Sequence, residues 1–189
     1  MPKVVDHDAR RREITGALWR LAAREGLEAA SLASVAAEAG VSKGRVQHYF
    51  ASRDELLAFA ASALRERLGA RVSARVAAAG TDPRAVVRAL LAGLLPLDEE
   101  GRADALVGSA FLVRAIADPA ARAQLRTGEE EILAALADGL AALPGVRDPR
   151  AEAEVLHALV GGLADSLLVE RHTPDSALAV LDRHLAALG

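Results

Sequence analysis

Four short segments of this chain place a capping side chain directly before a proline, and they limit what the chain can fold into. They are Asp82-Pro83, Asp118-Pro119, Asp148-Pro149 and Thr173-Pro174. Asp and Thr side chains accept hydrogen bonds from the first turn of a helix, and proline is favoured at the first helical position. Each of these segments therefore predicts the start of a helix.

The composition also favours an all-α fold. Hydrophobic residues make up 52% of the 189 residues and aromatic residues only 3%, so the apolar residues are mostly Ala, Leu and Val. This mixture suits packed helices better than sheets, and no segment alternates apolar and polar residues as a half-buried strand would. We expect nine helices, over about 8–25, 32–39, 43–49, 53–79, 83–96, 99–117, 119–143, 149–171 and 174–188. A break in the seventh helix near Gly128 is an open alternative.

Several classes of protein are disfavoured. The chain has no Cys, which excludes disulfides, thiolate chemistry and Cys-based metal sites. It has no signal-type N-terminus, and its longest apolar stretch, near 155–169, is too short to span a bilayer. We find no Gly-rich phosphate loop, HExxH or G-x-S-x-G motif. We therefore expect a cytoplasmic protein that is not an enzyme, with no metal, cofactor or membrane partner.

Charge is distributed unevenly along the chain. Residues 1–53 hold nine Lys/Arg against six Asp/Glu, and the remainder holds 14 Lys/Arg against 20 Asp/Glu. A basic head on an acidic body is expected if only the head meets phosphate. We predict two domains, a DNA-binding head over 1–53 and a ligand-binding and dimerisation domain over 54–189.

The stretch SLASVAAEAGVSKGRVQHYFASRDELL, which begins at Ser31, predicts a helix-turn-helix followed by the start of another helix. Ser31 and Ser42 stand where N-caps are needed, and Gly40 stands where the turn needs positive φ. Ser52 and Glu55 form a capping-box pattern, in which the Glu55 carboxylate would reach back to the Ser52 amide.

The second helix of this motif carries polar side chains that suit the reading of DNA. Arg45 and Gln47 have the donors to read guanine and adenine edges. Gly44 allows close approach of the backbone, and His48 and Tyr49 suit phosphate contacts. The candidate DNA-contacting residues are Ser31, Ser42, Lys43, Gly44, Arg45, Gln47, His48, Tyr49 and Arg53. The alternative is a solvated polar helix, on a dimeric ligand-binding or scaffold protein whose head has lost DNA affinity.

The motif VSKG-x₃-HYF-x-S-x-x-x-LL resembles the N-terminal domain of the TetR family of transcriptional regulators. The body resembles the choline-responsive BetI-like branch of that family, in the segments LLPLDEEGRADALVGSAFLVRAIADPAARAQLR and LHALVGGLADSLLVERHTPDSALAVLDRHL. The resemblance implies a nine-helix homodimer that binds a palindromic operator and usually represses. It also implies that residues matching Ser31, Lys43, Arg45, Gln47, His48, Tyr49 and Arg53 contact DNA.

The last two predicted helices carry the apolar stripes expected of a dimer surface, and two such pairs would form a four-helix bundle. The predicted interface residues are Leu156, Leu159, Val160, Leu163, Leu167, Leu178, Leu181 and Leu185. The alternative is that these stripes belong to an ordinary monomer core.

A pocket for a small-molecule effector of unknown identity is expected among the fourth to eighth helices, where small side chains dominate. Its candidate residues are Leu94, Phe111, Arg114, Leu136 and Asp165. Arg114 lies in the apolar run SAFLVRAIA, so it could pair with an anionic ligand, pair with Asp165 or point to solvent.

Overall fold

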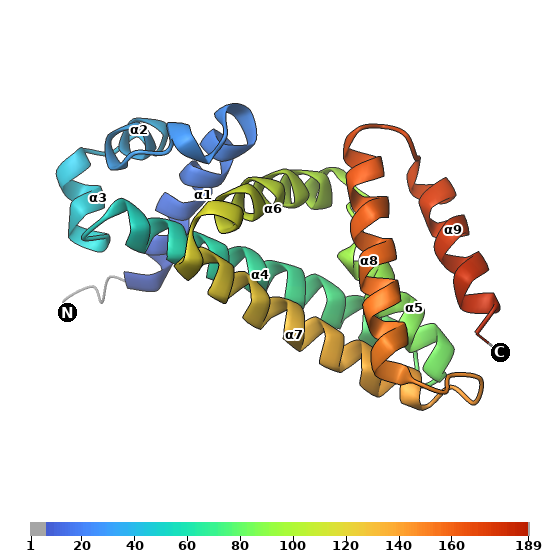
Figure 1. Ribbon diagram of the computed structural model, residues 1–189. Helices are drawn as coiled ribbons and strands as arrows, with labels where there is room; N and C mark the ends of the chain where they lie inside the picture. Colours follow the sequence, from blue (N-terminus) through green and yellow to red (C-terminus); the bar gives the residue numbers. More distant parts are fainter. Residues whose placement is uncertain (1–6, 189) are drawn as a thin grey trace. The chain divides into compact units, whose positions relative to one another are not determined.

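The computed structural model describes residues 7–188 (Figure 1). Within that range the chain forms nine α-helices and no strand, which confirms the predicted all-α fold. The helices are α1 (His7–Glu25), α2 (Leu32–Glu38), α3 (Lys43–Tyr49), α4 (Arg53–Ala78), α5 (Pro83–Leu94), α6 (Glu99–Ala117), α7 (Pro119–Ala141), α8 (Pro149–Leu168) and α9 (Pro174–Ala186). A short 3-10 helix, η1 (Leu27–Ala29), lies between α1 and α2. None of the helices in this range is both long and apolar enough to cross a membrane.

The helix starts follow the predicted capping pattern. Asp82 accepts the amide of Ala85 at 2.8 Å, and Asp148 accepts the amide of Ala151 at 3.0 Å. Asp118 accepts the amides of Ala120 and Ala121 at 2.9 and 3.3 Å, and Thr173 accepts the amide of Ser176 at 3.3 Å. The helix ends are less well predicted. Helix α8 ends at Leu168 because Glu170 turns to a φ of 59°. Helix α7 runs through Gly128, so the predicted continuous helix is confirmed there and the alternative of a break is wrong.

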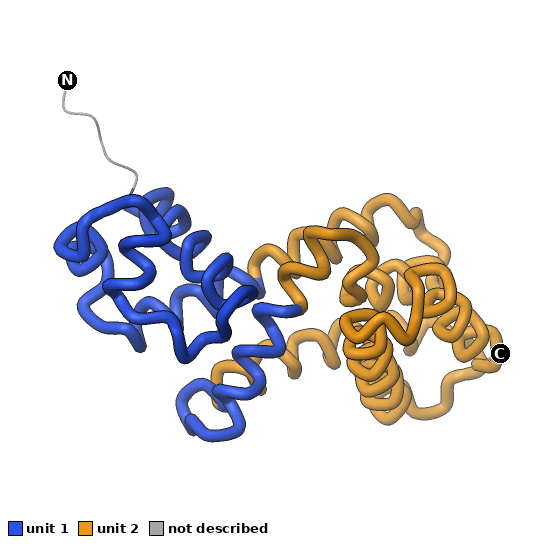
Figure 2. Tube along the Cα trace, turned by 90° about the horizontal axis from the view of Figure 1, so that it is seen from above, with its two compact units in different colours: residues 1–65, 106–122 blue, residues 66–105, 123–189 orange. Residues whose placement is uncertain are grey.

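The described chain divides into two compact units (Figure 2). Unit 1 comprises residues 1–65 and 106–122, and unit 2 comprises residues 66–105 and 123–189. The domain boundary predicted after residue 53 thus differs from the division into compact units. The reason is that the start of α4 and the second half of α6 pack with the helix-turn-helix.

The core of unit 1 is built where α1 to α4 meet. Leu18, Val35, Val46 and Phe50 are completely buried in it. Phe111 of α6 packs against the same core from outside the helix-turn-helix. The helix-turn-helix therefore rests on a small core that includes a contribution from α6.

The core of unit 2 is built mainly from α5, α7, α8 and α9, and Leu91, Leu136, Leu156 and Leu181 are completely buried there. Helices α8 and α9 lie side by side and are joined by a turn (Figure 1). Arg102 of α6 donates to the carbonyls of Leu167 and Leu168 at 3.0 and 2.9 Å, which satisfies the last turn of α8.

An ion-pair cluster joins α4 to α6 within unit 2. The Asp104 carboxylate, whose side chain is 9% exposed, accepts from Arg71 Nη1 at 2.9 Å and lies 3.2 Å from Arg67 Nη2. Arg67 also pairs with Glu100, whose side chain is 74% exposed. Close to this cluster, a Cβ on Gly93 would lie 2.9 Å from Val72 Cγ2, so α5 and α4 can cross tightly only because residue 93 is glycine.

Candidate nucleic-acid interface

Helix α3 is anchored mainly by Val46 and leaves most of its other side chains exposed to solvent. Ser42 accepts the Arg45 amide at 3.2 Å and caps the helix, and Val46 is completely buried. Phe50, also completely buried, ends the helix. The side chains of Lys43, Arg45, Gln47 and His48 are exposed, Gly44 is exposed with them, and Tyr49 is half-buried.

The turn before α3 has the geometry of a Schellman motif, which ends α2 at a fixed angle. Gly40 has a φ of 66°, its amide donates to the Ala37 carbonyl at 3.1 Å, and the Val41 amide donates to the Ala36 carbonyl at 3.0 Å. The start of α2 is equally well defined, because Ser31 accepts the amide of the third helical residue, Ser34, at 3.0 Å. The predicted turn and caps are confirmed.

The outward face of α3 is centred on Gly44. With about 100° per residue, Gly44 and His48 lie opposite the buried Val46, and Arg45 and Gln47 lie on either side. A Cβ on Gly44 would meet only Ser42 Oγ, at 4.0 Å, and its φ is not positive. Within the described residues, nothing in the chain's own packing therefore requires glycine here.

The end of α3 is braced by aromatic rings. The Tyr49 ring centroid lies 5.0 Å from that of His48 and 4.8 Å from that of His7 on α1. These contacts hold Tyr49 against unit 1 while His48 stays exposed. Contact of either side chain with phosphate stays a prediction.

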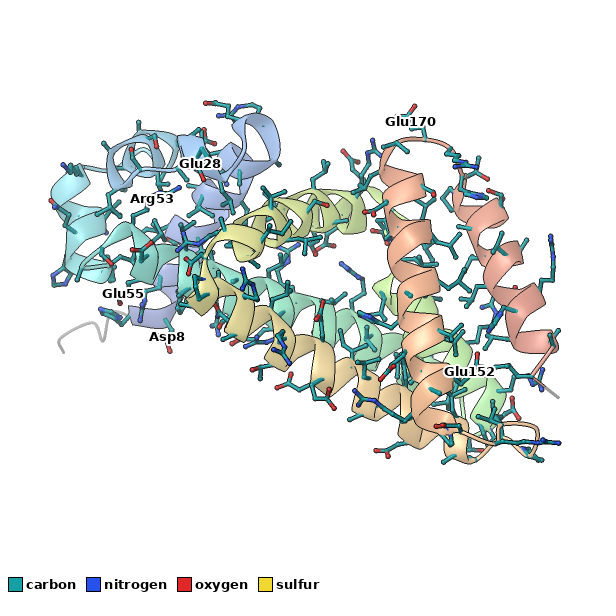
Figure 3. All side chains as sticks on the ribbon, in the orientation of Figure 1. Asp8, Glu28, Arg53, Glu55, Glu152 and Glu170 are labelled. Carbon is teal, nitrogen blue, oxygen red and sulfur yellow. The ribbon has the colours of Figure 1, made fainter. Side chains whose placement is uncertain are left out.

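Arg53 has partners that its sequence position did not indicate. Its Nε donates to the Ala30 carbonyl at 2.6 Å and its Nη2 to the Leu27 carbonyl at 2.7 Å. Glu28 lies 3.9 Å away, and Figure 3 shows the two side chains close together. The guanidinium thus holds the backbone just before α2. These bonds do not test whether Arg53 contacts DNA, which stays a prediction.

The capping box at the start of α4 differs in one bond from the prediction. Ser52 accepts the Glu55 amide at 3.1 Å as expected, but the Glu55 carboxylate accepts the amide of Ala51, at 2.8 Å, and not that of Ser52. Its other oxygen accepts from Arg11 Nη2 at 2.8 Å. Arg11 also lies over the Phe50 ring, 4.6 Å from its centroid, so α1, α3 and α4 are joined at one place.

A second group of arginines joins α1 to the end of α2. Arg20 and Arg24 donate to the two oxygens of Glu38 at 2.9 and 3.0 Å. The hydrogen bonds from Arg20 and then Arg24 hold the pKa of the Glu38 carboxyl below its ordinary value. No local sequence signal indicates these pairs, because their members lie 14 and 18 positions apart.

The five predicted pocket residues have separate environments. Phe111 and Arg114 belong to unit 1, whereas Leu94, Leu136 and Asp165 belong to unit 2. Arg114 donates to Asp54 at 3.0 Å and to Asp118 at 2.8 Å, and both carboxylates belong to unit 1. Leu136 is completely buried in the core of unit 2, and Asp165 is exposed.

Most of the predicted dimer stripe is used by the chain's own core. Helix α8 turns its larger side chains toward α5 and α9, where they are buried in the core of the same chain, so their contact with a second chain stays a prediction. Leu159 and Leu178 remain half-exposed. The residues buried in this way are Leu156, Val160, Leu163, Leu167, Leu181 and Leu185.

Two family models match the chain. Residues 14–59 match the model described as "Bacterial regulatory proteins, tetR family", and residues 83–189 match "BetI-type transcriptional repressor, C-terminal". The chain is 34% identical over 194 residues to the HTH-type transcriptional regulator PksA of Bacillus subtilis, covering 100% of this chain and 94% of that protein. It is 32% identical over 164 residues to the regulator BetI of Burkholderia mallei, covering 86% and 84% of the two chains.

Solved structures have the same fold. A transcriptional regulator from Rhodococcus sp. Rha1 superposes with a TM-score of 0.86 at 34% identity, covering 94% of this chain and 95% of that one. A regulator from Saccharomonospora viridis in complex with choline has a TM-score of 0.78 at 24% identity, covering 95% of each chain. Together with the exposed polar helix of a well-formed helix-turn-helix, these matches show that the chain belongs to the TetR family of transcriptional regulators, with a DNA-binding N-terminal domain and a C-terminal domain of the BetI type.

Proposed function

We propose that this regulator is a repressor that reads a palindromic operator as a homodimer and leaves it when a small molecule binds the C-terminal domain. The observation that carries the proposal is the exposed face of α3. Arg45 and Gln47 flank Gly44 on that face, and Val46 anchors the helix from the opposite side. An Arg and a Gln presented in this way can each make a bidentate contact in the major groove, with guanine and adenine respectively.

The test is a double variant, Arg45→Ala with Gln47→Ala. The probe is the duplex that the unaltered protein enriches from a random-sequence pool. Each lost bidentate contact is worth about 1–3 kcal/mol, and the double variant loses two of them in each of the two half-sites. The affinity for this duplex should therefore fall about 700-fold or more in a mobility-shift titration. The control is Arg147→Ala, which removes an exposed arginine of unit 2 and should leave the affinity unchanged. If the double variant bound the duplex with unchanged affinity, α3 would not be the helix that recognises the base sequence.

Dimerisation is proposed through the outer face of α8. Opposite the buried side chains this face carries Ala158, Gly161 and Gly162, and it also carries the apolar side chain of Val155, which is 50% exposed. Val169, directly after the end of the helix, is 75% exposed. A Cβ on either glycine would meet nothing within 4 Å, so a second helix could approach closely. A dimer would read two half-sites about 34 Å apart, which one helix-turn-helix cannot do.

The class of effector is proposed from the placement of aromatic residues. Quaternary ammonium ions such as choline are recognised by cages of aromatic rings. The five aromatic residues of this chain, Trp19, Tyr49, Phe50, Phe59 and Phe111, all fall in unit 1. Within the BetI-type region, 83–189, the one aromatic residue is Phe111, and it packs against the core of the head. The proposed effector is therefore held by aliphatic contacts and is not a quaternary ammonium ion.

Choline chloride is accordingly expected neither to raise the thermal midpoint of the protein nor to release it from the enriched duplex. Sodium chloride at the same ionic strength is the control, because phosphate contacts weaken with any salt. Release by choline beyond that control, together with a raised midpoint, would contradict the proposed effector class and leave DNA reading intact.

A further inference from the structure

The helix-turn-helix has its two ends bonded together by one side chain. Arg53 is the first residue of α4, and it lies 23 positions after Ala30, which directly precedes the cap of α2. The guanidinium donates to the Ala30 carbonyl at 2.6 Å and to the Leu27 carbonyl at 2.7 Å. Everything between these ends, α2, the turn and α3, thus forms a closed loop.

The carbonyls that Arg53 engages are at buried residues. Leu27 is 5% exposed and Ala30 is 1% exposed, whereas the Arg53 side chain is 36% exposed. A fork of N–H groups on a planar guanidinium can satisfy two such carbonyls at once, and a lysine ammonium cannot reproduce that geometry. The exposed Glu28, 3.9 Å away and with a side chain 96% exposed, is a weak partner by comparison.

From this geometry we infer that Arg53 is a positioning residue for operator reading and not a phosphate contact. By joining the start of α4 to the backbone before α2, it sets the orientation at which α3 is presented. Fixing that orientation before binding reduces the ordering cost of the complex. The inference rests on the reading of DNA by α3 proposed above.

The test compares Arg53→Lys with Arg53→Gln on the enriched duplex, well below each variant's thermal midpoint. Both variants should lose about tenfold or more in affinity, because both lose the fork. The slope of log affinity against log salt should stay at the unaltered protein's value in both, since the loss of one phosphate contact from each chain of the dimer would reduce its magnitude by about 1.8. Without DNA, amide hydrogen exchange over residues 32–49 should be faster in both variants, with α8 and α9 unchanged.

Three results would overturn the inference. A lysine variant that binds like the unaltered protein, with a glutamine variant whose salt slope falls in magnitude by about 1.8, would make Arg53 a phosphate contact. Faster exchange with unchanged affinity would make it merely structural. Unchanged hydrogen exchange over residues 32–49 would show that the Arg53 fork does not hold the helix-turn-helix. The exchange experiment needs no DNA, so it tests the inference even if no duplex is enriched. Failure to enrich a duplex would instead count against the proposed function.

Discussion

A chain carrying Gly161→Arg is expected to be monomeric in solution, to keep its helical fold and to lose most of its affinity for the full operator. The physical reason is that residue 161 lies on the outer face of α8, where a Cβ would meet nothing within 4 Å of the same chain. Replacing an exposed helical glycine raises helix propensity by up to about 1 kcal/mol, so the fold of the single chain should not suffer. A long charged side chain would, however, prevent two α8 helices from packing closely.

Sedimentation measures the oligomeric state, and circular dichroism measures the helical content. Gly69→Arg is the matched control, because Gly69 is also an exposed helical glycine with nothing within 4 Å, but on α4. The control should stay dimeric. If Gly161→Arg is as dimeric as the control, the proposed dimer surface on α8 is wrong, and the two chains must associate through another face.

Asp104→Asn is expected to lower the free energy of unfolding by about 3 kcal/mol. The carboxylate is nearly buried and faces Arg71 and Arg67, at 2.9 and 3.2 Å. The substitution removes the carboxylate that faces the Arg71 guanidinium, whose side chain is 20% exposed, and breaking such a pair costs more than the pair itself contributes. In thermal denaturation at fixed protein concentration, the midpoint should fall by roughly 6–12 °C for a chain of this length.

Glu100→Gln is the matched control for this prediction. Glu100 also pairs with Arg67, at 2.6 Å, but its side chain is 74% exposed. An exposed ion pair contributes about 0–1 kcal/mol, so the midpoint of this variant should move little. If both substitutions lowered the thermal midpoint by the same small amount, burial of Asp104 would not increase the contribution of its ion pairs to stability.

The positions of the helices could be predicted well because the signals that start a helix act over a few residues. Asp82, Asp148 and Thr173 each accept the amide three positions later, as their place before a proline indicates. Helix ends were predicted less well. The end of α8, for example, includes a Glu170 with a φ of 59°, and no residue type in that segment signals such a backbone.

In the candidate DNA-binding site, too, some features could be predicted from the sequence and others could not. The exposed face of α3 followed from residue types and helical spacing. The roles of Arg11 and Arg53 did not, because an exposed arginine and one that holds buried carbonyls look alike in a sequence. Arg53 bonds to residues 23 and 26 positions away, and Arg11 bonds to Glu55, 44 positions away.

The helix-turn-helix, with its capped helices and polar face on α3, is encoded locally in Ser31 to Glu55, so residue order was enough to predict that this chain presents a helix to DNA. The direction in which α8 faces could not be obtained in that way. Its leucines and valines could equally have met a second chain, and only packing against α5 and α9 buried Leu156 and Leu163 and left Gly161 and Gly162 outside. Burial depends on which distant helices meet, and the arrangement of those helices is a property of the folded chain.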